Sequence, residues 1–196
     1  MNAMLKRTLI LSLLLAFGLT AGLANAKTLD AGTFYLEPKV GIYGNSNKRI
    51  GSMFSFGGEL GFFPINGLSI GAEFLGYAVT QKKNAFGSSN SWETVGAFSP
   101  IGIIRYHFIN EQNYSIFAGV GLGGFFSGTK IPRGNGETSN LTEMAEVGFN
   151  YFLTDMISLQ LAGRWQHIGD WDYNKNSRLQ TGSDNWGGNL AVKFVF

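Results

Sequence analysis

The chain ends in Gly187-Gly188-Asn189-Leu190-Ala191-Val192-Lys193-Phe194-Val195-Phe196. Large apolar residues occupy every second position from Leu190 to Phe196, while the polar residues Asn189 and Lys193 lie on the alternate positions. Successive side chains of a β-strand point to opposite faces, so this alternation predicts a strand with one apolar and one polar face. Such a strand suits a sheet that has lipid on one side and a polar interior on the other.

Seven upstream segments show the same alternation. The eight predicted strands are residues 33–43, 52–63, 68–80, 94–108, 114–126, 141–153, 157–168 and 185–196. The fourth is the least regular, because Ile101 and Ile103 fall on the same face as Arg105 and His107. Lipid offers no hydrogen-bond partner to the backbone, so strands can span it only in a sheet without edges. The predicted fold class is therefore all-β, an eight-stranded antiparallel up-and-down transmembrane β-barrel.

The connections between these segments alternate in length. Short connections at 64–67, 109–113 and 154–156 follow strands two, four and six, and longer ones rich in Gly, Ser, Asn and Lys span 44–51, 81–93, 127–140 and 169–184. Short periplasmic turns and longer outer loops are typical of membrane barrels. We expect both ends of the barrel domain on the periplasmic side.

Aromatic residues gather near the predicted strand ends. The inner ends carry Phe34, Phe62, Phe108, Tyr114, Tyr151 and Phe196, and the outer ends carry Trp92, Trp165, Trp171 and Trp186. Two aromatic girdles mark the two membrane interfaces. A soluble lipocalin-like barrel also has eight alternating strands, but the girdles favour the membrane protein.

The N-terminus has the composition of a secretory signal peptide. Lys6 and Arg7 precede an apolar run, and Ala24-Asn25-Ala26 matches a cleavage site, which predicts a signal peptide at 1–26 and a barrel domain at 27–196. Cleavage removes two of the 15 basic residues and none of the 13 acidic ones, so the exported part is neutral. It has no basic patch for nucleic acid, and without cysteine it has no thiolate metal site or thiol nucleophile.

The face opposite the apolar one carries eight charged residues, four acidic and four basic. These are Glu37, Lys39, Glu59, Glu73, Arg105, Glu146, Arg164 and Lys193. Eight strands enclose a space that side chains just fill, so opposite charges there can pair. We expect a packed polar lumen rather than an ion-conducting one, and no wide pore.

The last strand resembles the C-terminal signal that the outer-membrane assembly machinery reads, with Phe194 and Phe196 at its end. With Phe117-Ala118-Gly119-Val120-Gly121-Leu122-Gly123 and Glu146-Val147-Gly148-Phe149-Asn150-Tyr151, the chain resembles the small outer-membrane β-barrel or opacity-type (OmpA-like, OmpX-like) family. The resemblance implies the outer membrane of a Gram-negative bacterium, with outer-membrane lipid and lipopolysaccharide as partners. It implies no single activity, since this architecture hosts several functions.

The segment Arg164-Trp165-Gln166-His167-Ile168 resembles the histidine region of outer-membrane lipid A 3-O-deacylases, which makes His167 a candidate general base. Alternation places His167 on the lipid-facing side. Acyl transfer also needs a nucleophile beside the base. The family's serine follows the histidine by two residues, and that position is Gly169 here.

Two further motifs resemble a dinucleotide-binding loop and a calcium loop but lack required features. We therefore expect no cofactor and no metal. Gly119, Gly121 and Gly124 have dinucleotide-loop spacing but lie within a predicted strand, not at a strand-to-helix turn. Asp170, Asp172, Asn174 and Asn176 begin like a calcium loop, but Lys175 and Thr181 replace the required glycine and glutamate.

Three functions stay open at this stage. The first is a non-enzymatic structural or surface-interaction barrel that acts through its outer loops. The second is a deacylase-like enzyme that uses His167. The third is a carrier of small hydrophobic solutes through a lateral opening, where Pro38 or Pro100 would interrupt the strand ladder.

Overall fold

Eight antiparallel strands form the protein, as described by a computed structural model for residues 29–45, 49–83, 91–133, 136–169 and 182–196. The strands are β1 (Phe34–Asn45), β2 (Ile50–Ile65), β3 (Leu68–Lys82), β4 (Trp92–Asn110), β5 (Tyr114–Ile131), β6 (Glu137–Phe152), β7 (Ile157–Gly169) and β8 (Ser183–Val195). The predicted fold class is confirmed. Within the described ranges, no helix is long and apolar enough to cross a membrane.

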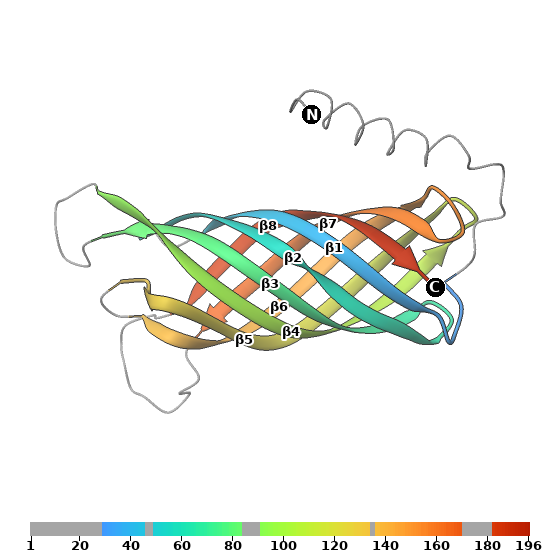
Figure 1. Ribbon diagram of the computed structural model, residues 1–196, viewed down its shortest axis with the longest axis horizontal. Coiled ribbons are helices and arrows are strands. Elements are labelled where there is room, and N and C mark those ends of the chain that lie inside the picture. The colour runs from blue at the N-terminus through green and yellow to red at the C-terminus, as the bar shows by residue number, and fades with distance from the viewer. Residues whose placement is uncertain (1–28, 46–48, 84–90, 134–135, 170–181) are drawn as a thin grey trace, which may run out of the picture.

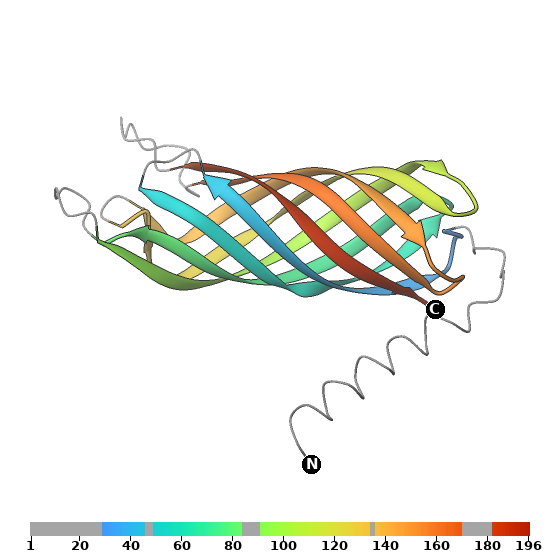
Figure 2. The same ribbon diagram turned by 90° about the horizontal axis from the view of Figure 1, so that it is seen from above.

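The sheet closes on itself. Each strand pairs with its neighbours in sequence, and β8 pairs with β1 to complete the barrel. At this seam the backbone N–H of Phe34 donates to the carbonyl of Phe196 and the N–H of Phe196 donates to that of Phe34, both at 2.9 Å. Figures 1 and 2 show tilted strands around one long axis, with the C-terminus at the end where the short turns lie.

The alternation in sequence becomes an inside and an outside. In β1, Tyr35, Glu37 and Lys39 are buried, whereas Phe34 and Ile42 point outward and are exposed. The other strands repeat the pattern, so the outer wall presents large apolar side chains, as a lipid-facing surface requires. In the irregular β4, Ile101 and Ile103 lie inside, where they pack with Met144.

The predicted outer loops are too long, and the predicted strands correspondingly too short. β5 continues to Ile131 and β6 begins at Glu137, although the sequence predicted a loop over 127–140. The alternation of apolar and polar residues fades there, but Phe126 still pairs with Ser139 and Ile131 with Glu137. Backbone ladder bonds need no apolar side chain, so the strands extend beyond the patterned segment.

The aromatic residues lie near the expected ends of the strands. Phe34, Phe108 and Phe196 are exposed near the short turns, and Trp92 and Trp186 are exposed near the outer ends. Trp171 lies outside the described residues.

Two prolines interrupt the ladder. Pairing of β1 with β8 skips from Leu36–Phe194 to Lys39–Ala191 around Pro38, and pairing of β4 with β5 skips from Phe98–Phe126 to Ile101–Gly123 around Pro100. Proline has no N–H to give to a neighbouring strand. Beside Pro100 the buried hydroxyl of Ser99 donates to the carbonyl of Gly124 at 2.7 Å. A side chain thus supplies a hydrogen bond across the interrupted seam.

We predict that Ser99→Ala destabilises the barrel by about 1–2 kcal/mol, because it leaves the Gly124 carbonyl without this donor. Ser69→Ala is the matched control, since the Ser69 hydroxyl is equally buried but has no hydrogen-bond partner among the described residues. Urea unfolding of the protein refolded in lipid vesicles, followed by tryptophan fluorescence, measures both. Equal effects of the two substitutions would contradict the role given to Ser99.

Candidate functional site

The eight predicted lumen charges lie together at mid-height in the barrel. Every strand except β5 contributes at least one of them, and each side chain is 4% exposed or less. Register explains why they meet: Glu37 pairs with Glu59, Glu59 with Glu73, and Glu146 with Arg164 on neighbouring strands. We call this set of eight residues the charge belt.

Two arginines connect the belt across the lumen. Arg105 contacts Glu59 through both terminal nitrogens, with Nη2–Oε2 at 2.7 Å, and its Nε lies 2.5 Å from Glu146 Oε1. Arg164 donates to both oxygens of Glu73 at 2.7 and 2.8 Å and to Glu146 at 2.8 Å. Two-pronged guanidinium–carboxylate pairs are stronger and more specific in geometry than neutral hydrogen bonds.

The two lysines complete the belt. Lys39 Nζ lies 2.7 Å from both Glu59 and Glu73 and 3.0 Å from Glu37. Lys193 Nζ lies 3.1 Å from Glu37. Each of the four glutamates therefore contacts at least two cationic side chains, and the belt as a whole is neutral.

β5 makes room for the belt instead of adding to it. A Cβ at Gly119 would lie 2.8 Å from Arg105 Cγ and 3.3 Å from Glu146 Cγ, closer than carbon atoms normally approach. Gly119, Gly121 and Gly124 all lie inside this strand. The glycines with dinucleotide-loop spacing are thus part of a β-strand. The space next to Gly119 is filled by charged side chains of β4 and β6.

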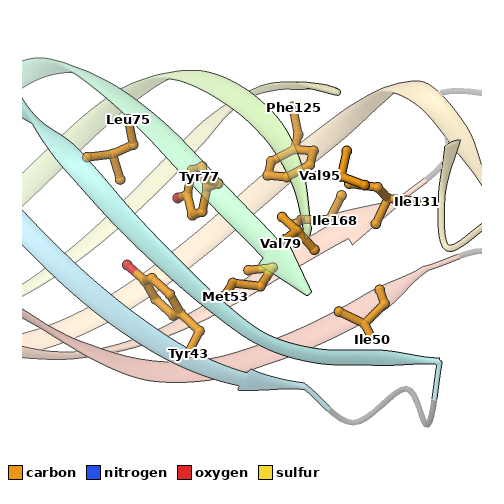
Figure 3. Packing of buried hydrophobic residues seen from close by; sticks show 10 residues of the cluster. All are labelled: Tyr43, Ile50, Met53, Leu75, Tyr77, Val79, Val95, Phe125, Ile131 and Ile168. Carbon is orange, nitrogen blue, oxygen red and sulfur yellow. The ribbon is translucent and has the colours of Figure 1, made fainter. Parts of the chain in front are cut away.

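Apolar clusters lie on both sides of the belt, which the sequence did not predict. The outer cluster contains Tyr43, Ile50, Met53, Leu75, Tyr77, Val79, Val95, Phe125, Ile131 and Ile168 (Figure 3). The inner cluster contains Leu29, Tyr35, Phe63, Phe152 and Val195. The sequence contains apolar residues on the same strand faces as the charges. In the sequence alone, however, they look like irregularities in the apolar–polar alternation.

Tyrosines join the apolar clusters to the polar interior. The hydroxyl of Tyr43 donates to Asn189 at 2.5 Å, and that of Tyr77 donates to Gln166 at 3.1 Å. The ring centroids of Tyr43 and Tyr77 lie 6.2 Å apart; Figure 3 shows both side chains. Tyr35 of the inner cluster donates to Glu59 at 2.5 Å. Their hydroxyls are thereby satisfied, as buried polar groups need to be.

His167 points outward, as its position in the alternation predicts. Its Nδ1 lies 2.9 Å from Asp184 Oδ1 on β8, and Trp165 Nε1 donates to the same oxygen at 3.3 Å. Gly169 provides no nucleophile, and Ser183 is buried on the inward side, where it accepts from Asn45. The structure therefore places an acid beside the histidine, but neither Gly169 nor Ser183 provides a hydroxyl next to it.

The predicted calcium-loop residues and the assembly signal are not tested by the structure. Asp170, Asp172, Asn174 and Asn176 lie outside the described residues. In the described part of the chain, no group of three His, Asp or Glu side chains is placed to hold a metal ion. Phe194 and Phe196 are exposed on the outer wall, and their role as an assembly signal stays a prediction.

Known structures share this architecture. Neisserial surface protein A (NspA) aligns with a TM-score of 0.59 at 17% identity, over 84% of this chain and 99% of that one. The chain has the fold of the small outer-membrane β-barrels. Two structures from Pseudomonas aeruginosa have the same fold. The N-terminal barrel domain of OprF aligns with a TM-score of 0.55 at 16% identity, over 85% of this chain and 98% of that one. OprG aligns with a TM-score of 0.56 at 10% identity, over 88% of this chain and 99% of that one. No family model and no curated protein sequence matches the chain significantly.

We predict that Arg164→Met lowers the free energy of unfolding by about 3–5 kcal/mol, because Glu73 and Glu146 each lose a buried cationic partner. Glu73→Gln in the same chain should restore part of that loss, since it removes one of the uncompensated charges. Unfolding by urea in vesicles measures each variant.

The control is Arg133→Met, which breaks the ion pair with Glu93 at the partly exposed rim and should cost less than about 1 kcal/mol. If Arg164→Met cost no more than this control, the belt would contribute no more stability than an exposed pair.

Proposed function

We propose that the protein is a non-enzymatic outer-membrane barrel with a closed lumen, which holds its outer loops on a rigid support for structural or surface-interaction roles. The observation that carries this proposal is the charge belt, in which four acids and four bases form ion pairs across the lumen. The fold favours the outer membrane of a Gram-negative bacterium, and the predicted signal peptide at 1–26 is consistent with export.

The belt argues against conduction on physical grounds. An ion that crossed it would have to separate buried partners, and an uncompensated buried charge costs several kcal/mol. The apolar clusters on both sides offer an ion no replacement for its water. An eight-stranded barrel of this kind is a filled structure, not a channel.

The outer rim supports the role given to the loops. Arg133 follows β5 and pairs through Nε and Nη2 with both oxygens of Glu93 on β4, at 2.6 and 2.9 Å. Gln81 of β3 donates to Glu93 at 3.1 Å and accepts from the backbone N–H of Arg133 at 3.1 Å. These contacts fix the bases of two outer connections against each other. Loops on a rigid support are the usual place for recognition, and lipopolysaccharide or another surface ligand is the partner we expect.

We predict that the refolded protein gives no stepwise conductance in planar lipid bilayers. Arg105→Ala removes a fully buried side chain and leaves the glutamates in excess, so it should introduce a small cation-selective conductance. Faster migration of the unboiled sample on a denaturing gel verifies that each protein is folded. Ohmic steps from the unmutated barrel would overturn the closed lumen.

A second candidate function is lipid modification at His167. The observation that favours it is the contact with Asp184, because an acid that orients one imidazole nitrogen leaves the other to act as a base. Neither Gly169 nor Ser183 supplies a serine nucleophile. A deacylase reaction at His167 would therefore have to use water or a residue outside the described part of the chain.

The two candidates differ in their effect on lipid A. We predict that mass spectrometry finds identical lipid A acylation in cells without the protein, with it, and with its His167→Ala variant. Loss of an acyl chain that depends on His167 would instead establish the enzyme and contradict the first proposal.

A further inference from the structure

The outer wall becomes polar at the outer ends of β3, β4 and β5, at the end of the barrel opposite the C-terminus (Figure 1). Nearer the middle of these strands, the outward residues are large, apolar and exposed, and include Phe74, Phe98 and Phe126. Toward the outer end follow two cross-strand pairs, Thr80 with Thr94 and Lys82 with Trp92. Gln81, which lies between Thr80 and Lys82 in the chain, is buried, so both pairs point outward.

Lys130 of β5 belongs to the same part of the rim. Its carbonyl accepts a hydrogen bond from Gln81 Nε2 at 3.2 Å, and Gln81 directly precedes Lys82. The next residue, Ile131, is buried in the outer cluster, so the exposed side chain of Lys130 points away from the lumen. Lys83, which follows β3, is also exposed. Three neighbouring strands thus end in a patch of lysines and hydroxyl groups.

Nearby carboxylates leave much of this positive charge uncompensated. Lys82 has no ion-pair partner within the described ranges. Lys130 Nζ lies 3.9 Å from Glu137, and both side chains are about half exposed, a geometry that contributes little. Glu93 of β4 already accepts two hydrogen bonds from Arg133, at 2.6 and 2.9 Å. The outward face of the patch therefore favours an anionic ligand.

Trp92 and the backbone hold Lys82 in position. The Lys82 Nζ lies 5.7 Å from the ring centroid of Trp92, which is a cation–π contact. The backbone N–H of Lys82 donates to the carbonyl of Arg49 at 2.9 Å. A side chain that is already ordered loses less freedom when it binds a ligand. Tryptophan also marks the headgroup region of a membrane, so the anion that fits here is part of a lipid headgroup.

The opposite side of the barrel has the reverse charge at its outer end. The outward row there consists of Glu143, His167 and Asp184, on paired positions of β6, β7 and β8. Two of these three residues are acids. Because the charge is distributed so unevenly around the rim, an anionic headgroup is attracted to β3–β5 and repelled from β6–β8.

We propose that Lys82 and Lys130 bind a phosphate group of lipopolysaccharide. This lipid forms the outer leaflet of a Gram-negative outer membrane, and the sugars of its headgroup carry phosphates. Ammonium groups donate charge-assisted hydrogen bonds to phosphate, and the hydroxyls of Thr80 and Thr94 add further donors beside them. The site rests on the proposed surface-interaction role, in which lipopolysaccharide is an expected partner, and it assigns that contact to one side of the rim.

Isothermal titration calorimetry of the refolded barrel in detergent micelles tests the proposal with two ligands. One is rough lipopolysaccharide, and the other is the same material after hydrofluoric acid has removed its phosphate groups. The unmutated protein should bind the phosphorylated form about three- to tenfold more tightly, as expected for two exposed charge contacts. Equal affinity for the two forms would overturn the proposal, and so would displacement of lipopolysaccharide by an equal amount of phosphatidylglycerol.

Variants assign the preference to individual side chains. The double variant Lys82→Gln, Lys130→Gln should lose most of the preference for the phosphorylated form, with little change in its affinity for the dephosphorylated one. Lys82→Arg with Lys130→Arg should keep the preference, because a guanidinium group also binds phosphate. Glu143→Gln is the control: it makes the net charge more positive by one unit on the other side of the rim and should change the preference less than about twofold.

Two results would contradict the site. If the double glutamine variant kept the full preference, the lysines would not bind phosphate. If Glu143→Gln increased the preference as much as the double variant lowered it, overall charge would determine binding. Faster migration of unboiled samples on a denaturing gel verifies folding. Conductance and lipid A acylation, which test the proposed function, should be the same in all these variants, so the phosphate site and the proposed function can fail separately.

Discussion

Every part of this structure depends on the need to satisfy backbone hydrogen bonds where lipid offers none. The barrel meets it by closing β1 onto β8, and the seam is completed by the mutual bonds of Phe34 and Phe196. Where proline removes a donor at Pro100, the hydroxyl of Ser99 donates to the carbonyl of Gly124 across the pairing of β4 with β5. The even number of strands follows from closure of an antiparallel sheet that begins and ends on the same side.

Closure at eight strands leaves a narrow interior, and that interior sets the second constraint. Charged side chains placed there cannot remain hydrated, so they must pair. Arg105 and Arg164 each pair with two glutamates from different strands, and Gly119 leaves the space that Arg105 and Glu146 occupy. Apolar clusters lie on either side of these pairs. The same packing that stabilises the barrel also argues for a closed lumen.

The outer wall follows a different logic, because lipid is its solvent. A smooth apolar surface would satisfy the bilayer without any specificity. Gly163 interrupts it, and the hollow formed there is also lined by Trp165 and Trp186. This hollow lies over β6, β7 and β8, in the region that also contains His167.

The sequence by itself determined the strand count, the order of short and long connections, and the inward position of the eight charged residues. It could do so because a strand's two-residue period is a local property that a bilayer and a narrow lumen both reinforce. Only the tertiary structure decided which glutamate meets which arginine, since Glu73 and Arg164 lie on strands that are not neighbours and meet across the lumen. It also decided that Tyr77, Phe125 and Ile168 form a cluster and that Asp184 reaches His167. These contacts depend on register and on barrel closure, which join residues far apart in the chain and leave no periodic trace in it.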